Sequence, residues 1–114
     1  MARKVRHATH DILETIERLQ TVISGKTFDD FQADWALRFI VQRGIEIISE
    51  ASRRIPPELL ETRPEIRWRS IGTIGNVLRH EYHTISDKVI WDVVTLEFRT
   101  LKLAIEAIDA ALDQ

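Results

Sequence analysis

Asparagine, arginine, tyrosine and two histidines gather in one short segment of the chain, between residues 76 and 83. On a helix, residues four positions apart share a face, so Asn76 and His80 should point the same way. An imidazole can take up and release protons near neutral pH, and beside an amide, an arginine and a tyrosine it can also bind an anion. The segment therefore predicts a site for proton transfer or for anion binding.

Ordinary structural roles compete with this interpretation. A lone histidine on a helix is more often a surface or core residue than a catalyst, Arg79 and Glu81 could be solvated charges, and Tyr82 could be a core aromatic residue. His80 and His83 could bind a metal ion, but no third ligand is nearby in the sequence, so we predict no metal site and no cofactor. The sequence also lacks a glycine-rich phosphate loop, an H-E-x-x-H motif and a nucleophile elbow.

The elements that must position this segment are predicted to be helices, because apolar residues recur at helical spacing along nearly the whole chain. Gly25 is a natural stop for the first helix, and Thr27, Asp34 and Ser86 are suitable N-caps for later ones. Helices are predicted over about residues 5–24, briefly after Thr27, over 35–54, 58–62 and 69–83, and from Ser86 onward with a kink between residues 95 and 99. The expected fold is all-α, an antiparallel bundle of four to five helices with short connections.

Length and composition fit one globular domain over residues 1–114. The chain is 44% hydrophobic and 30% charged, which is typical of proteins with a packed core. It has no cysteine, so disulfides, cysteine zinc sites and thiol nucleophiles are excluded and a reducing compartment is favoured. No apolar run is long enough to span a membrane and no signal peptide is recognised, so we expect a soluble cytoplasmic protein with no membrane partner.

The distribution of charge limits the kind of nucleic-acid contact that the chain could make. A formal net charge of -2 argues against a protein that grips long nucleic acids by their phosphates. Four arginines lie between residues 63 and 83, whereas the segment from residue 84 to the end has six acidic and three basic residues. Any contact with RNA is therefore expected to be local and centred on the candidate segment, and no DNA partner is expected.

Several segments, in this order and at this spacing, resemble one family over nearly the full length of the chain. They are residues 10–18, 25–31, 45–51 and 64–68, the pattern Asn76-x-x-x-His80-x-Tyr82, and residues 89–94. The chain resembles HepT-like proteins, the minimal HEPN-domain ribonucleases of toxin–antitoxin systems. The resemblance implies a HEPN-like helical bundle and an RNA substrate.

The family's motif is an arginine, usually followed by asparagine, and then His-x-Tyr. Asn76, His80 and Tyr82 match it, whereas the position of the arginine falls on Gly75. In the family, histidine and arginine form a metal-independent RNase site at the two-fold interface of a homodimer. The resemblance thus implies that His80 moves a proton and that Asn76 positions His80 or the phosphate. Arg79 is the candidate that could replace the missing arginine, from the same chain or from the second copy.

The family's tyrosine implies regulation by a partner. HepT-like toxins are paired with a small nucleotidyltransferase antitoxin that adenylylates the tyrosine of the His-x-Tyr element. The match places the acceptor at Tyr82, where an attached AMP would add negative charge and bulk beside the phosphate site.

The glycine at position 75 keeps two other readings open. The chain could be a catalytically degenerate HEPN protein that acts only as a binding partner of a nucleotidyltransferase, or a helical scaffold in which His80 is structural. Gly75 could also let packed helices come closer together, because it has no side chain.

Overall fold

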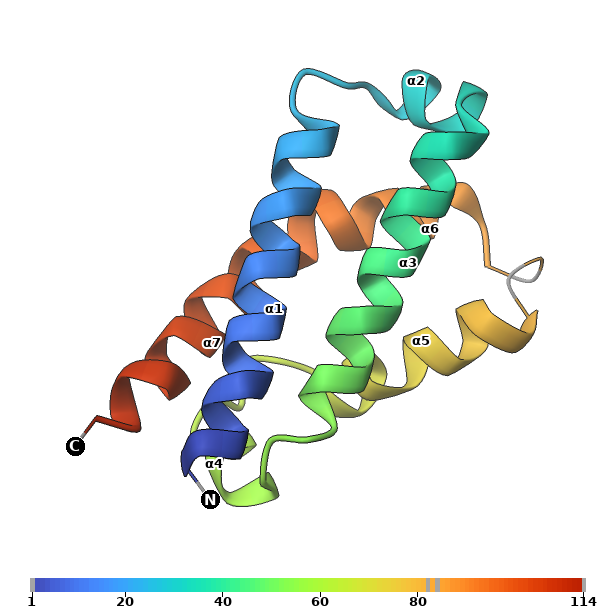
Figure 1. Ribbon diagram of the computed structural model, residues 1–114. Coiled ribbons are helices and arrows are strands. Elements are labelled where there is room, and N and C mark those ends of the chain that lie inside the picture. Colours follow the sequence, from blue (N-terminus) through green and yellow to red (C-terminus); the bar gives the residue numbers. More distant parts are fainter. Residues whose placement is uncertain (1, 82, 84, 114) are drawn as a thin grey trace.

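Long and short helices build the molecule, as Figure 1 shows for the computed structural model, which describes residues 2–81, 83 and 85–113. The elements are α1 (Ala2–Ile23), α2 (Phe28–Ala33), α3 (Trp35–Ser52), α4 (Pro57–Leu60), α5 (Trp68–Glu81), α6 (Asp87–Asp92), the π-helical turn η2 (Val93–Glu97) and α7 (Phe98–Ala111). These described ranges contain no strand, so the prediction of an all-α fold is confirmed. Within them, no helix is both long enough and apolar enough to cross a membrane.

Local signals in the sequence set where the helices begin and end. Gly25, with a φ of 74°, takes the left-handed backbone conformation that follows a helix end. Thr27 and Asp30 form a capping box at the start of α2, since each backbone N–H donates to the other's side chain, at 3.1 and 2.8 Å. Hydrogen bonds to the Asp30 carboxylate, first from the backbone and then from the side chain of Thr27, lower the pKa of Asp30. The caps at Asp34 and Ser86 are confirmed as well.

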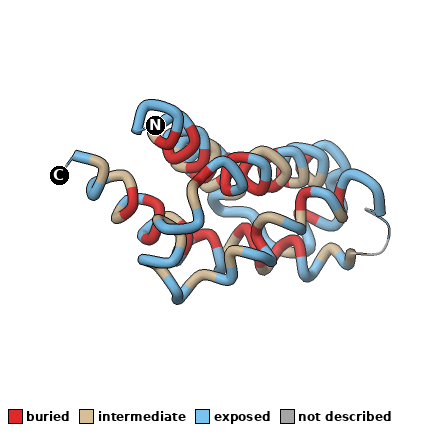
Figure 2. Tube along the Cα trace, turned by 90° about the horizontal axis from the view of Figure 1, so that it is seen from below, coloured by how far each residue is buried: buried red, intermediate tan, exposed pale blue. Residues whose placement is uncertain are grey.

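The core lies where α3 meets α1 on one side and α5 on the other, and α7 closes the bundle against α1. α1 and α3 run antiparallel (Figure 1). Buried residues, red in Figure 2, follow one side of each long helix. The most deeply buried side chains include Ile12, Ile16, Val41, Ile45, Ile48, Phe98, Leu101 and Ile105. The helical stripes predicted from the sequence are therefore the core.

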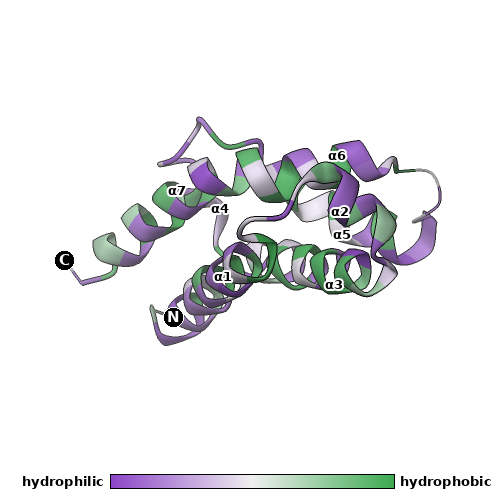
Figure 3. Cartoon of the chain, turned by 90° about the horizontal axis from the view of Figure 1, so that it is seen from above, coloured by the Kyte–Doolittle hydropathy of each residue, from purple (hydrophilic) through white to green (hydrophobic). Residues whose placement is uncertain are grey.

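Three apolar residues that helical spacing would align with the buried stripes lie instead at the surface. Ile40, Val89 and Leu96 are 48%, 51% and 58% exposed. Ile40 lines an open hollow between α3 and α1 instead of the packed core. Hydrophobic residues along α3 can be followed in green in Figure 3. Leu96 lies in η2, where the wider turn changes the direction of the side chains relative to a regular α-helix. The predicted kink between residues 95 and 99 overlaps this π-helical turn.

Candidate functional site

Helix α5 carries the candidate residues. One side of this helix packs against the core, and the other side faces solvent. Ile71, Gly75 and Leu78 are buried and fasten the helix to the core. Asn76 and His80, four positions apart, are both exposed. Their shared exposure agrees with helical spacing, which places residues four positions apart on one face. An exposed imidazole next to an exposed amide can reach a ligand that approaches from solvent.

Gly75 makes the closest contact between α5 and α3. Its backbone N–H donates to the hydroxyl of Ser49, with 3.1 Å between nitrogen and Oγ. A Cβ atom at position 75 would lie only 2.7 Å from Cβ and Oγ of Ser49 and 3.3 Å from Cα of Glu46. Glycine thus lets two helices of the same chain come together here, as the sequence suggested. The position of the family's arginine is buried and has no room for a side chain.

Arg79 points toward α3 and forms ion pairs with two carboxylates on that helix. Its Nε lies 3.7 Å from Oε1 of Glu46, and a terminal nitrogen lies 4.0 Å from Oε2 of Glu50. The same carboxylates bind Arg43 at 3.5 Å and Arg53 at 2.8 Å. The Arg79 side chain is 47% exposed, so one side of the guanidinium faces solvent. The pair with the exposed Glu50 carboxylate, at 4.0 Å, is expected to be weak, so Arg79 keeps donors available for a phosphate.

The structure brings three of the four predicted residues to the C-terminal half of α5. Asn76 and His80 face outward, and Arg79 turns toward α3 beside them. The fourth, Tyr82, lies outside the described residues. His83 is exposed just beyond the helix. Within the described ranges, no group of three His, Cys, Asp or Glu side chains is placed to share a metal ion.

Glu46 and Glu50 are part of this site, although the sequence did not assign them to it. They lie four positions apart on α3. In the sequence, each has an arginine three positions away, Arg43 for Glu46 and Arg53 for Glu50, and such spacing predicts only ordinary ion pairs within one helix. The contact with Arg79 joins residues 33 positions apart (79 minus 46). It depends on the packing of α5 onto α3 at Gly75, which helical spacing alone does not show.

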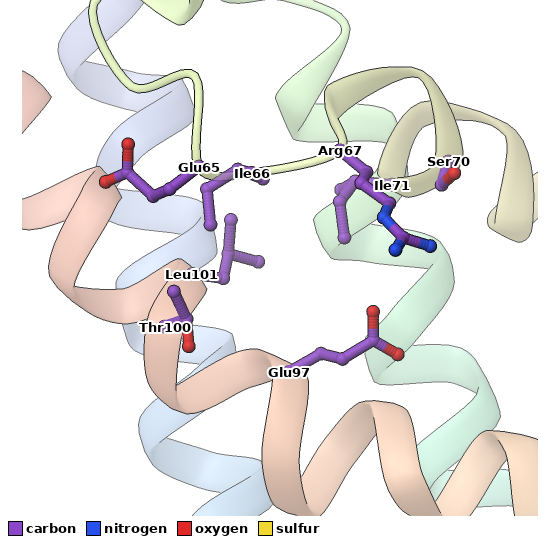
Figure 4. A pocket seen from close by; sticks show the side chains of 8 residues that line it. All are labelled: Glu65, Ile66, Arg67, Ser70, Ile71, Glu97, Thr100 and Leu101. Atoms are coloured by element: carbon purple, nitrogen blue, oxygen red, sulfur yellow. The ribbon is translucent and has the colours of Figure 1, made fainter.

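Two hollows lie at opposite ends of α5. The first, of about 410 Å³, lies between α3 and α5 and includes Arg79. The second, shown in Figure 4, lies between the start of α5 and the η2–α7 segment and is lined by Glu65, Ile66, Arg67, Ser70, Ile71, Glu97, Thr100 and Leu101. Ser70 precedes His80 by ten positions, or about 15 Å along a helix, so the second hollow is separate from the candidate site.

Comparison with known proteins places the chain in a family. It matches the family model described as "Ribonuclease HepT-like" over residues 12–108. A relative from Thermococcus cleftensis, named "Probable ribonuclease HepT", is 34% identical over 102 residues, which cover 90% of this chain and 93% of the relative. No solved structure matches the chain.

Two further relatives are named provisionally as RNases. One from Caldanaerobacter subterraneus subsp. tengcongensis is 31% identical over 85% of this chain and 87% of its own length. One from Methanocaldococcus jannaschii is 30% identical over 81% of this chain and 76% of its own length. The resemblance seen in the sequence is thereby confirmed. The chain belongs to the HepT-like ribonuclease family.

Proposed function

We propose that this chain is an RNA-cleaving toxin of a toxin–antitoxin pair, with His80 as the proton-transfer residue. The observation that carries the proposal is the exposed face of α5, where His80 and Asn76 match the family's motif and Arg79 lies beside them. The family match and the RNase names of the relatives support RNA as the substrate. The nucleotidyltransferase partner, the homodimer and the adenylylation of Tyr82 are parts of the same proposal.

The reaction needs no metal ion, because RNA carries its own nucleophile. His80 takes the proton from a ribose 2′-hydroxyl, and the oxygen attacks the neighbouring phosphorus. The bond from phosphorus to the 5′-oxygen of the next nucleotide breaks, which leaves a 2′,3′-cyclic phosphate. The departing oxygen takes a proton from water and becomes a 5′-hydroxyl, and His80 returns its proton to solvent. Arg79 binds the phosphate as negative charge builds up, and Asn76 positions His80 or the phosphate.

The active form is a homodimer with its two sites at the two-fold interface. Arg79 of one chain is directed toward its own α3 by Glu46 and Glu50. A second copy that approaches the exposed face of α5 would bring its Arg79 to His80 of the first chain. That arginine would compensate for the glycine at position 75. Light scattering on the purified protein measures the molecular mass and therefore the oligomeric state. A monomeric mass under assay conditions would contradict the shared site.

One structural observation favours a second candidate function. Position 75, where the family's motif has arginine, is a glycine that is buried against Ser49 and leaves no room for a longer side chain. The second candidate is a degenerate HEPN protein that only binds a nucleotidyltransferase. The two functions differ in RNA cleavage, which only the first requires.

Replacing Arg79 with alanine is expected to lower the rate of RNA cleavage by about 100-fold, as loss of one donor to a developing oxyanion does elsewhere. Arg79→Lys should restore part of the rate, because a charge without the bidentate fork still attracts phosphate. Arg53→Ala is the matched control, since Arg53 pairs with the same Glu50 and lies outside the site. A rate unchanged by Arg79→Ala would remove Arg79 from the mechanism.

Incubation with ATP and the proposed partner nucleotidyltransferase is expected to add one adenylyl group to Tyr82. Intact-mass spectrometry detects the gain, and peptide mapping locates it. The modified protein should cleave RNA more slowly, because the added phosphate repels the substrate. Tyr82→Phe should prevent the gain in mass, and an adenylyl group on any other residue would contradict the assignment.

A further inference from the structure

The hollow between α3 and α5 adjoins the proposed cleavage site. It is lined by six side chains, three of them charged: Phe39, Gln42, Arg43, Glu46, Leu78 and Arg79. Arg79 belongs both to this hollow and to the proposed phosphate contact. A group bound in the hollow would therefore lie one nucleotide or less from a phosphate held by Arg79.

An exposed aromatic ring forms one wall of the hollow. Phe39 is 64% exposed, which is unusual for a residue of this size and polarity. Trp35, one helical turn earlier, is 65% exposed, and the two rings meet edge to face with centroids 5.4 Å apart. The buried side chain of Leu78 adds an apolar surface to the hollow. Flat apolar surfaces of this kind bind unpaired bases by stacking.

The remaining lining groups suit the polar edges and flanking phosphates of a base. Gln42 offers both a donor and an acceptor, and the Glu46 carboxylate offers acceptors. In the ion-pair cluster beside the hollow, Arg43, Arg53 and Arg79 outnumber Glu46 and Glu50, which leaves one net positive charge. This balance complements a nucleotide, in which a neutral base is joined to a phosphate.

We propose that this hollow binds an unpaired nucleobase of single-stranded RNA, next to the phosphate that is cut. The inference rests on the proposed function and adds the substrate class: single-stranded RNA with a base free to stack on Phe39. A base inside a duplex is already stacked and paired, so double-stranded RNA would bind more weakly.

A second copy of the chain is the main competing occupant of this surface. In a two-fold contact, residues near the axis face their own counterparts. A contact centred on Phe39 would bring each Arg43 close to its copy, and each is 67% exposed and carries a positive charge. The like charges oppose that contact, whereas the phosphates of RNA attract them. The observations therefore favour RNA.

The test measures binding of a labelled single-stranded 2′-O-methyl oligonucleotide, which lacks the attacking hydroxyl and so stays intact. Phe39→Ala is expected to weaken binding by about 10-fold, within the range found when a stacking ring is removed. Phe39→Trp should retain the affinity and Phe39→Leu should lose it, because only the first keeps an aromatic face. Leu103→Ala is the matched control, since Leu103 is 68% exposed on α7 and outside the hollow.

Two results would overturn the inference. One is equal affinity for the wild type and Phe39→Ala. The other is a lower molecular mass for Phe39→Ala than for the wild type in light scattering, which would assign the surface to a second copy. The binding assay does not depend on cleavage. Failure of the proposed cleavage would therefore be seen in the separate cleavage assay, as unmodified RNA left intact by the wild type.

Discussion

His80→Ala is expected to reduce RNA cleavage by about 100- to 10,000-fold, the range typical for loss of a general acid or base. The side chain is exposed on α5, so its removal should leave the fold and stability nearly unchanged. The direct measurement is the rate at which purified protein cleaves single-stranded RNA. In cells, expression of the wild type should arrest growth and the variant should not.

The control for this prediction is His7→Ala, which removes an exposed imidazole from α1, far from the site along the chain. It should cleave RNA at the rate of the wild type. Equal rates for the wild type and His80→Ala would mean that cleavage has another origin, such as a contaminating nuclease. A wild type without any cleavage would favour the degenerate binding protein.

Gly75→Arg restores the family's motif arginine and is nevertheless expected to destabilise the protein without raising its activity. Any Cβ at this position would be forced against Ser49, where only 2.7 Å is free. Overpacking of this kind costs about 1–3 kcal/mol, and a buried guanidinium adds the cost of desolvating its charge. Thermal or urea unfolding followed by circular dichroism measures the loss.

Two variants test the cause of this loss. Gly72→Ala is the matched control on the same helix, since its Cβ would meet the flexible side chain of Arg53 at 3.3 Å. It should be tolerated much better than Gly75→Ala. Ser49→Gly removes the two nearest atoms that Gly75→Ala would meet, so the double variant should recover part of the stability lost in Gly75→Ala. A Gly75→Arg protein as stable as the wild type and faster in cleavage would refute this account of the packing.

The helix boundaries could be predicted because their causes are local. A cap such as Asp34 needs only the backbone N–H of Leu37, 3.1 Å away, and a helix end such as Gly25 needs only a residue that tolerates a positive φ. The buried stripes of α1 and α3 could also be predicted, since helical periodicity selects one face. These features depend on neighbours within one or two turns.

The geometry of the candidate site depends on contacts between helices, which the sequence does not encode locally. Family resemblance identified Asn76 and His80, but the direction of Arg79 is set by Glu46 and Glu50 on another helix. Likewise, the burial of Gly75 follows from its distance to Ser49. The exposure of Ile40 depends on how α1 packs beside α3, which helical spacing cannot tell.

The π-helical turn between α6 and α7 affects how related chains should be aligned. Such a turn arises when one extra residue is accommodated within an α-helix, and its hydrogen bonds then span five positions instead of four. A homologue without that residue would need a one-residue gap between Val93 and Glu97. With the gap there, the buried partners on both sides, Trp91 and Phe98, keep equivalent positions. A gap placed elsewhere would pair core positions of one chain with surface positions of the other.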